Sequence, residues 1–259
     1  MTEQASGTDR LRALLVPLAT VGTIAFNWLA ATGWINNVTP AEVSARYTTV
    51  VTPAGYAFSI WSLIYVGLIA FSIYQLLPAN AAKLRGIRSL YILTCALNCG
   101  WVYFWHHDQI GICFVLIFLL AVCLLLINLS LRETSSLGEY WLVKAPFSIY
   151  FGWVTAATLV NFAILLVSLE TQISSSSWTW IGVGLILLAA VLGIIIRIRL
   201  SNYLYPLAIT WALTAIGVKQ SGQTLIVVAA AIGTIAGLIA TLSFVVGLPS
   251  TDNPRSVNE

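Results

Sequence analysis

The chain has 259 residues, of which 59% are hydrophobic and only 8% are charged. Soluble domains contain roughly 45–50% apolar and about 25% charged residues, so this composition predicts several membrane-spanning segments and excludes an ordinary soluble domain. The net charge is +3, and the 12 basic residues are scattered along the chain, which gives no footprint for a nucleic-acid partner.

Apolar runs follow one another along the chain, each near the length of about 17–25 residues that a helix needs to span a bilayer. The seventh run is the weakest, because it is short and contains Pro206. We therefore expect an all-α integral membrane protein with about eight transmembrane helices. The runs lie at 11–31, 55–77, 87–106, 110–130, 145–169, 178–196, 203–218 and 224–247.

The distribution of Lys and Arg indicates the orientation of these helices. If the N-terminus is cytoplasmic, ten of the 12 basic residues fall in cytoplasmic segments, and only Arg46 and Lys219 fall in external loops. An excess of Lys and Arg on the cytoplasmic side is the usual pattern in membrane proteins. We therefore expect both termini in the cytoplasm and the bundle in the plasma (inner) membrane.

One connection is long and polar, the external loop at 32–54 between the first two helices. A loop of more than about 15 residues in a compact protein is usually a functional lid or disordered. Trp34, Val50 and Val51 are apolar residues within it, and they favour a lid that packs on the bundle.

Few residues offer catalytic or metal chemistry. The four cysteines, Cys95, Cys99, Cys113 and Cys123, lie in apolar runs without metal-ligand spacing, which indicates buried reduced thiols. The sequence contains no Ser/His/Asp set, phosphate loop or metal motif, so neither an enzyme nor a metal site is favoured. His106-His107-Asp108 at the end of the third helix could ligate the metal of a haem or chlorophyll, but a polar cap at the membrane interface is the favoured interpretation.

Ten tryptophans are present, and the simplest explanation for each is the aromatic belt at headgroup level. This explanation suits the tryptophans at predicted helix ends. They are Trp34, Trp105, Trp141, Trp178 and Trp180.

Other aromatic and polar side chains lie too deep for the belt and recur on one face of their helices. A Tyr hydroxyl or Asn amide at such depth must find its partner inside the protein, because lipid offers none. One interpretation is that Tyr65, Asn98 and Asn161 only tie helices together. The other is a pocket for a flat hydrophobic ligand beneath the long loop. The stripes are Phe58, Trp61 and Tyr65; Asn98 and Trp101, whose spacing Trp105 continues at the helix end; and Trp153, Ala157 and Asn161.

At these positions the chain resembles the TspO/MBR family, the tryptophan-rich sensory proteins related to the mitochondrial translocator protein. Three elements carry the resemblance, on the second, third and fifth helices. Tyr56 stands where the family usually has Trp, and Pro146 lies seven residues before Trp153 instead of four. The matching residues are Pro53, Gly55, Phe58, Trp61 and Tyr65; Leu97, Asn98 and Trp101; and Trp153, Ala157 and Asn161.

The resemblance implies a five-helix bundle over 11–170 with the loop 32–54 as its lid. Three additional helices then occupy 171–248, between that bundle and a C-terminal tail at 249–259, and the N-terminal tail covers 1–10. The implied ligand is a porphyrin or other tetrapyrrole, a sterol or a similar hydrophobic molecule. Trp34 is the lid residue implied to take part in the site. The implied ligand-binding residues are Tyr56, Phe58, Trp61, Tyr65, Asn98, Trp101, Trp153, Ala157 and Asn161.

Three functions are compatible with these features. The first is a sensory or regulatory membrane protein that binds a planar hydrophobic ligand. The second is a transporter of a hydrophobic solute, and the third is an assembly or structural subunit of a membrane complex. Gly233-x3-Gly237 in the last helix is typical of close helix packing, with homodimerisation as the alternative.

Overall fold

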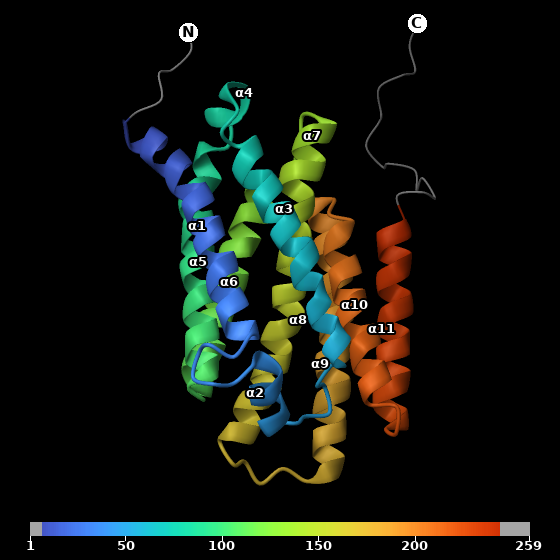
Figure 1. Ribbon diagram of the computed structural model, residues 1–259. Coiled ribbons are helices and arrows are strands. Elements are labelled where there is room, and N and C mark those ends of the chain that lie inside the picture. Colours follow the sequence, from blue (N-terminus) through green and yellow to red (C-terminus); the bar gives the residue numbers. More distant parts are fainter. Residues whose placement is uncertain (1–6, 244–259) are drawn as a thin grey trace, which may run out of the picture.

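The computed structural model describes residues 7–243, and all regular secondary structure in that part is helical (Figure 1). The short elements include α2 (Pro40–Arg46), α4 (Pro78–Ala81), α7 (Leu137–Glu139) and the π-helical turn η2 (Tyr140–Lys144). The 3₁₀ turn η1 (Gly55–Ser59) leads into α3 (Ile60–Tyr74). The other long helices are α1 (Gly7–Ala31), α5 (Arg85–His106), α6 (Ile110–Ser130), α8 (Ala145–Ser168), α9 (Ser175–Leu200), α10 (Leu204–Lys219) and α11 (Thr224–Leu242).

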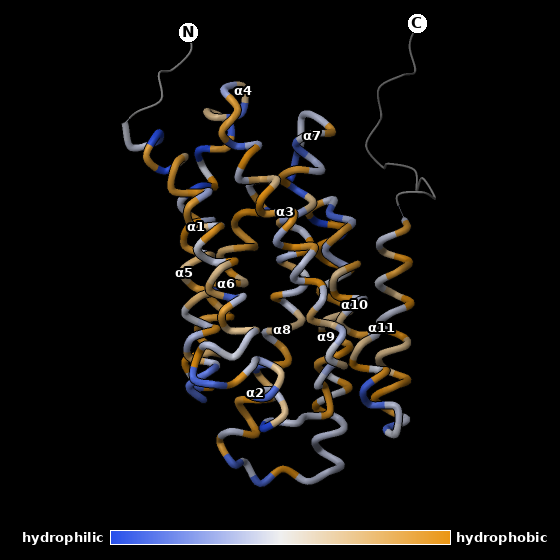
Figure 2. The backbone as a smooth tube through the Cα atoms, viewed as in Figure 1, coloured by the Kyte–Doolittle hydropathy of each residue, from blue (hydrophilic) through white to orange (hydrophobic). Residues whose placement is uncertain are grey.

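These long helices confirm the predicted all-α membrane architecture. Six segments of the described chain are long and apolar enough to cross a bilayer: α1, η1 with α3, α6, α7 through α8, α9 and α11. Helix α10 is apolar but only 16 residues long. Hydrophilic residues gather near the two ends of the bundle (Figure 2). The predicted tail at 249–259 lies outside the described residues.

Apolar side chains cover much of the outer surface of the bundle. Leu18 on α1, Val66 on α3 and Ile239 on α11 each expose about two thirds of their surface, at 68%, 65% and 66%. Exposed side chains of this kind, spread along several helices, are stabilised by lipid tails and not by water. The protein is therefore in contact with the lipid bilayer.

Helix α8 is the centre of the bundle. It packs against α3, α6 and α10, and α10 packs in turn with α9 and α11. Most of its residues from Ala145 to Ala156 are buried. This helix therefore joins the N-terminal five long helices to the C-terminal three.

Glycines allow the helices around α10 to approach closely. A Cβ atom at Gly152 of α8 would collide with the backbone oxygen of Tyr205, and one at Gly237 of α11 would collide with Thr210. At Gly233 it would lie 2.6 Å from Leu213 Cδ1. The Gly233-x3-Gly237 pair thus packs against α10 within the chain, as the packing interpretation predicted.

The lid contains a short helix, α2, whose start is fixed by a capping box. The Thr39 side chain accepts a hydrogen bond from the Glu42 amide at 3.3 Å, and Glu42 Oε2 accepts one from the Thr39 amide at 2.7 Å. Pro40 occupies the first helical position, where its missing N–H is not needed. Val43, completely buried, anchors this helix to the bundle.

Replacing Thr39 by Ala is expected to destabilise α2 by about 1 kcal/mol, because it removes the side-chain cap of the helix. Amide hydrogen exchange at 40–46, measured by mass spectrometry on protein in nanodiscs, would then become faster. Thr179→Ala on α9 is the matched control and should leave exchange in the lid unchanged. Equal exchange at 40–46 in Thr39→Ala and the unmodified chain would contradict the role of the capping box.

Candidate functional site

A pocket of about 60 Å³ lies inside the bundle beneath α2. We call the end of the bundle that carries α2 the lid end. Pro40 and Ser44 of α2 form the roof of the pocket, which is narrow and mainly apolar. Its walls are Pro53, Phe58, Trp61, Asn98, Trp101, Trp105, Ile117, Leu120, Trp153, Val154, Ala156, Ala157, Val160, Asn161, Ile164, Ala212 and Ile216.

The three predicted stripes meet at this pocket. Seven of the nine residues predicted to bind the ligand line it: Phe58, Trp61, Asn98, Trp101, Trp153, Ala157 and Asn161. The sequence pattern thus located one shared space from three separate helices.

The other predicted residues lie elsewhere. Tyr56 packs edge-on against Trp211 of α10, with ring centroids 5.3 Å apart. The Tyr65 ring stacks on the Trp61 ring, with centroids 5.4 Å apart. Tyr65 borders a second, more open hollow between α1, α3 and α5. Trp34 is 75% exposed, so its expected packing in the lid is not seen; Val43 and Val51 are the buried apolar residues there.

The aromatic walls are braced against one another. Phe58 and Trp153 meet edge to face with centroids 6.0 Å apart, and Trp101 and Trp105 stack at 5.5 Å. Such pairs stabilise by about 0.5–1.5 kcal/mol beyond simple burial, and they hold the rings in fixed orientations. The pocket therefore presents rigid aromatic surfaces.

The two asparagines of the pocket have different tasks. Asn161 Oδ1 accepts a hydrogen bond from Trp101 Nε1 at 3.2 Å, and its Nδ2 donates to the Ala157 carbonyl at 2.9 Å. Asn161 therefore ties α8 to α5 and orients the Trp101 ring, which fits the interpretation as a link between helices.

Asn98 keeps hydrogen-bonding capacity on the pocket side. Its Oδ1 accepts from Asn27 Nδ2 at 2.7 Å, whereas its own Nδ2 donates to no other described residue. The side chain is only 1% exposed and lines the pocket. A buried amide with unused donors is costly unless it is paired. Asn98 is therefore the polar group best placed to bond a guest.

Trp105 is a site residue that the belt assignment missed. It is 4% exposed and lines the pocket, and its indole N–H donates to the Pro40 carbonyl at 3.3 Å. The assignment was wrong because α2 covers the end of α5, where a lipid interface was expected. The helical spacing could have identified Trp105 as a pocket residue, since Trp105 continues the spacing of Asn98 and Trp101.

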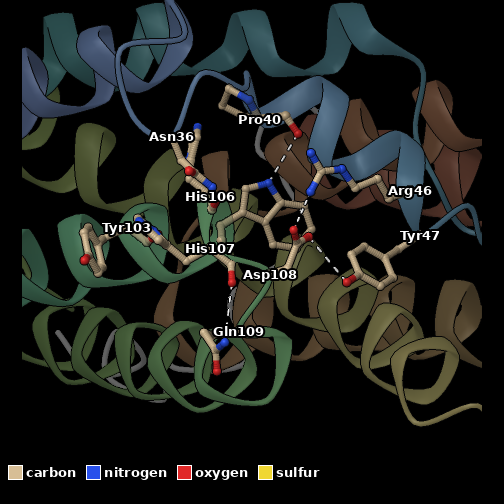
Figure 3. A network of polar contacts seen from close by, with 10 residues as sticks. Asn36, Pro40, Arg46, Tyr47, Tyr103, His106, His107, Asp108 and Gln109 are labelled. Atoms are coloured by element: carbon tan, nitrogen blue, oxygen red, sulfur yellow. Dashed lines mark hydrogen bonds and ion pairs between the residues drawn. The ribbon is translucent and has the colours of Figure 1, made fainter.

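A polar latch holds α2 onto the turn between α5 and α6 (Figure 3). Arg46 forms an ion pair with Asp108, and the Tyr47 hydroxyl donates to Asp108 Oδ1 at 3.4 Å. Asn36 Nδ2 donates to the His106 carbonyl at 2.7 Å. Burial raises the pKa of Tyr47, and the neighbouring Asp108 carboxylate raises it further. Tyr47 thus remains a neutral hydrogen-bond donor to Asp108.

The His106 imidazole is completely buried and does not line the pocket. Its Nδ1 lies 2.7 Å from the Val102 carbonyl, and its Nε2 has no partner among the described residues. In that part of the chain, no group of three His, Cys, Asp or Glu side chains could hold a metal ion.

Fold and pocket together define an all-α membrane protein with an aromatic pocket closed by a lid at one end of the bundle. The family model described as TSPO-like protein matches residues 13–244, and the chain belongs to this family. The match continues through α9, α10 and α11, beyond the part that carries the three motifs. No curated protein and no solved structure matches the chain.

Proposed function

We propose that this protein is a membrane sensor or regulator that binds a planar hydrophobic ligand in the pocket under α2. The ligand class is a porphyrin or other tetrapyrrole, a sterol, or a carotenoid-like molecule. The main observation behind this proposal is a mainly apolar pocket with four tryptophans in its walls and a folded lid above it. Typical small-molecule sites are mainly apolar, with few polar groups.

The residues of the pocket would have different roles in binding. The faces of Trp61, Trp101 and Trp153 would contact the flat ring system of the ligand, and Ala157 leaves room for it. Asn98 would donate a hydrogen bond to an oxygen or nitrogen of the ligand. Asn161 would act indirectly, because its amide is already used to orient Trp101.

The proposed placement is the plasma membrane, with the lid end facing outward and both termini in the cytoplasm. It is supported by the excess of Lys and Arg in the loops at the other end of the bundle. A ligand dissolved in the outer leaflet would then lie at the depth of the pocket.

Titration with protoporphyrin IX tests the proposal. We expect saturable quenching of tryptophan fluorescence by the unmodified protein in nanodiscs. Trp101→Ala should weaken the apparent affinity by several-fold, up to about tenfold, because an aromatic contact is worth about 0.5–1.5 kcal/mol. The control is Trp180→Ala, since Trp180 is 62% exposed on α9 and does not line the pocket.

Two results would contradict the proposal. One is the absence of saturable quenching by any porphyrin, together with no competition by a sterol. The other is saturable quenching that Trp101→Ala and Trp180→Ala weaken to the same extent, because the ligand would then bind outside the pocket.

A further inference from the structure

Helix α10 forms one wall of the candidate pocket. Ala212 and Ile216, one helical turn apart, both line it, and each is 4% exposed. They face a space whose other walls come from α3, α5, α6 and α8. Because α10 follows the five helices that carry the motifs, this wall comes from the C-terminal part of the chain.

Helix α10 also holds the segment through which the lid enters α3. The Ala54 amide donates to the Ala215 carbonyl at 2.9 Å, and Trp211 Nε1 donates to the Ala57 carbonyl at 2.9 Å. Figure 1 shows the end of the lid and the start of α3 beside α10. Both bonds join residues more than 150 positions apart in the sequence.

A third anchor lies at the end of α10. Gln220, which is 9% exposed, donates through Nε2 to the carbonyls of Thr49 and Thr52, each at 3.1 Å. Buried carbonyls without a donor are costly, particularly next to lipid. The last residues of the lid are therefore fixed to α10 by side chains and backbone together.

The anchored segment carries part of the pocket. Pro53 and Phe58 both line it, and Phe58 braces Trp153. A shift of this segment relative to α10 would move Phe58 away from Trp153 and change the width of the pocket. The contacts of Trp211 and Gln220 thus fix the position of groups that they do not touch.

We infer that α10 selects the ligand of this protein: Ala212 and Ile216 limit the size of the pocket, and Trp211 and Gln220 are positioning residues for the segment 49–58. The ligand in this inference is the one given by the proposed function, so the inference rests on that function. It assigns the C-terminal three helices a direct part in binding, beyond their packing against α8.

A larger side chain at position 212 tests whether Ala212 limits the size of the pocket. Ala212→Leu should raise the Kd for protoporphyrin IX at least about tenfold, because even one methylene in a close-fitting pocket changes binding by that order. Val218→Leu is the matched control, since Val218 lies on the same helix and is 56% exposed. Ile216→Val adds no bulk, so it should fold even if Ala212→Leu does not, and it should shift the Kd by at least about twofold. Unchanged affinity in Ile216→Val and in folded Ala212→Leu would contradict the claim that these two residues limit the size of the pocket.

Trp211→Phe tests the anchor without a ligand. It keeps a ring beside Tyr56 but removes the indole donor to Ala57, so amide exchange at 54–60 should rise about 2- to 10-fold. Exchange in α6 should stay the same, which separates loss of the anchor from general destabilisation. Unchanged exchange at 54–60 would overturn the positioning role. If the unmodified protein binds no porphyrin, the proposed function and the selective role of α10 both fail, and the exchange result still decides whether α10 holds this segment.

Discussion

Substituting Ala157 by Leu is expected to abolish most porphyrin binding while leaving the bundle folded. Ala157 lines the pocket on α8, between Trp153 and Asn161 in the helical stripe. Its added carbons would occupy the space that the ligand needs, so the Kd should rise at least about tenfold. Because the new side chain enters empty volume and not a close-packed core, the free energy of unfolding should change by less than about 1 kcal/mol.

Ala231→Leu is the matched control for this experiment. Ala231 lies on α11, on a face that is exposed in the bundle, so the same enlargement should alter neither quenching by protoporphyrin IX nor the melting temperature. Retention of full affinity by Ala157→Leu, with a melting temperature equal to that of the control, would show that the ligand binds elsewhere. A drop in melting temperature together with lost binding would instead point to a role for Ala157 in packing.

Replacing Gly152 by Ala is expected to destabilise the bundle. The new Cβ would collide with the Tyr205 carbonyl oxygen and lie 2.9 Å from Ala208 Cβ. The first of these atoms belongs to the backbone, so helices α8 and α10 must move apart. Overpacking of this kind costs about 1–3 kcal/mol, and each kcal/mol lowers the melting temperature by roughly 2–4 °C in a chain of this size.

Gly184→Ala provides the comparison, because a Cβ at Gly184 of α9 meets nothing within 4 Å. There the change should be neutral or stabilise the helix by up to about 1 kcal/mol, since Ala has the higher helix propensity. Thermal unfolding in detergent, followed by circular dichroism, separates the two variants. Equal melting temperatures would mean that α8 and α10 do not approach as closely as the structure has them.

The positions of the long helices could be predicted closely because lipid imposes a strong rule on sequence. Each spanning segment must be a long apolar run, and each run in this chain became a helix whose ends differ by a few residues from the prediction. The run with Pro206 is also a helix, α10, in which the proline lies in the first turn and breaks no hydrogen bond. The fold class was therefore readable from composition and run length.

The candidate site was only partly predictable. Helical spacing identified the inward stripes around Trp61, Trp101 and Trp153, because polar and aromatic side chains at depth must face protein. The place of Trp105 at a helix end assigned it to the membrane interface, since local sequence does not reveal that α2 covers the end of α5. The spacing placed Tyr65 in the pocket and the family resemblance placed Tyr56 there, although both rings turn to other partners.

By itself, the sequence determined that this is a helical membrane protein with a long polar loop and aromatic stripes on three helices, because lipid penalises every other arrangement of these residues. Only the tertiary structure decided that α10 closes the pocket and holds the end of the lid. Ala212 and Ile216 look like any lipid-facing residues in the sequence, and the bonds of Trp211 and Gln220 reach backbone groups about 150–170 residues away. Such contacts depend on which helices pack side by side, and local periodicity carries no information about that choice.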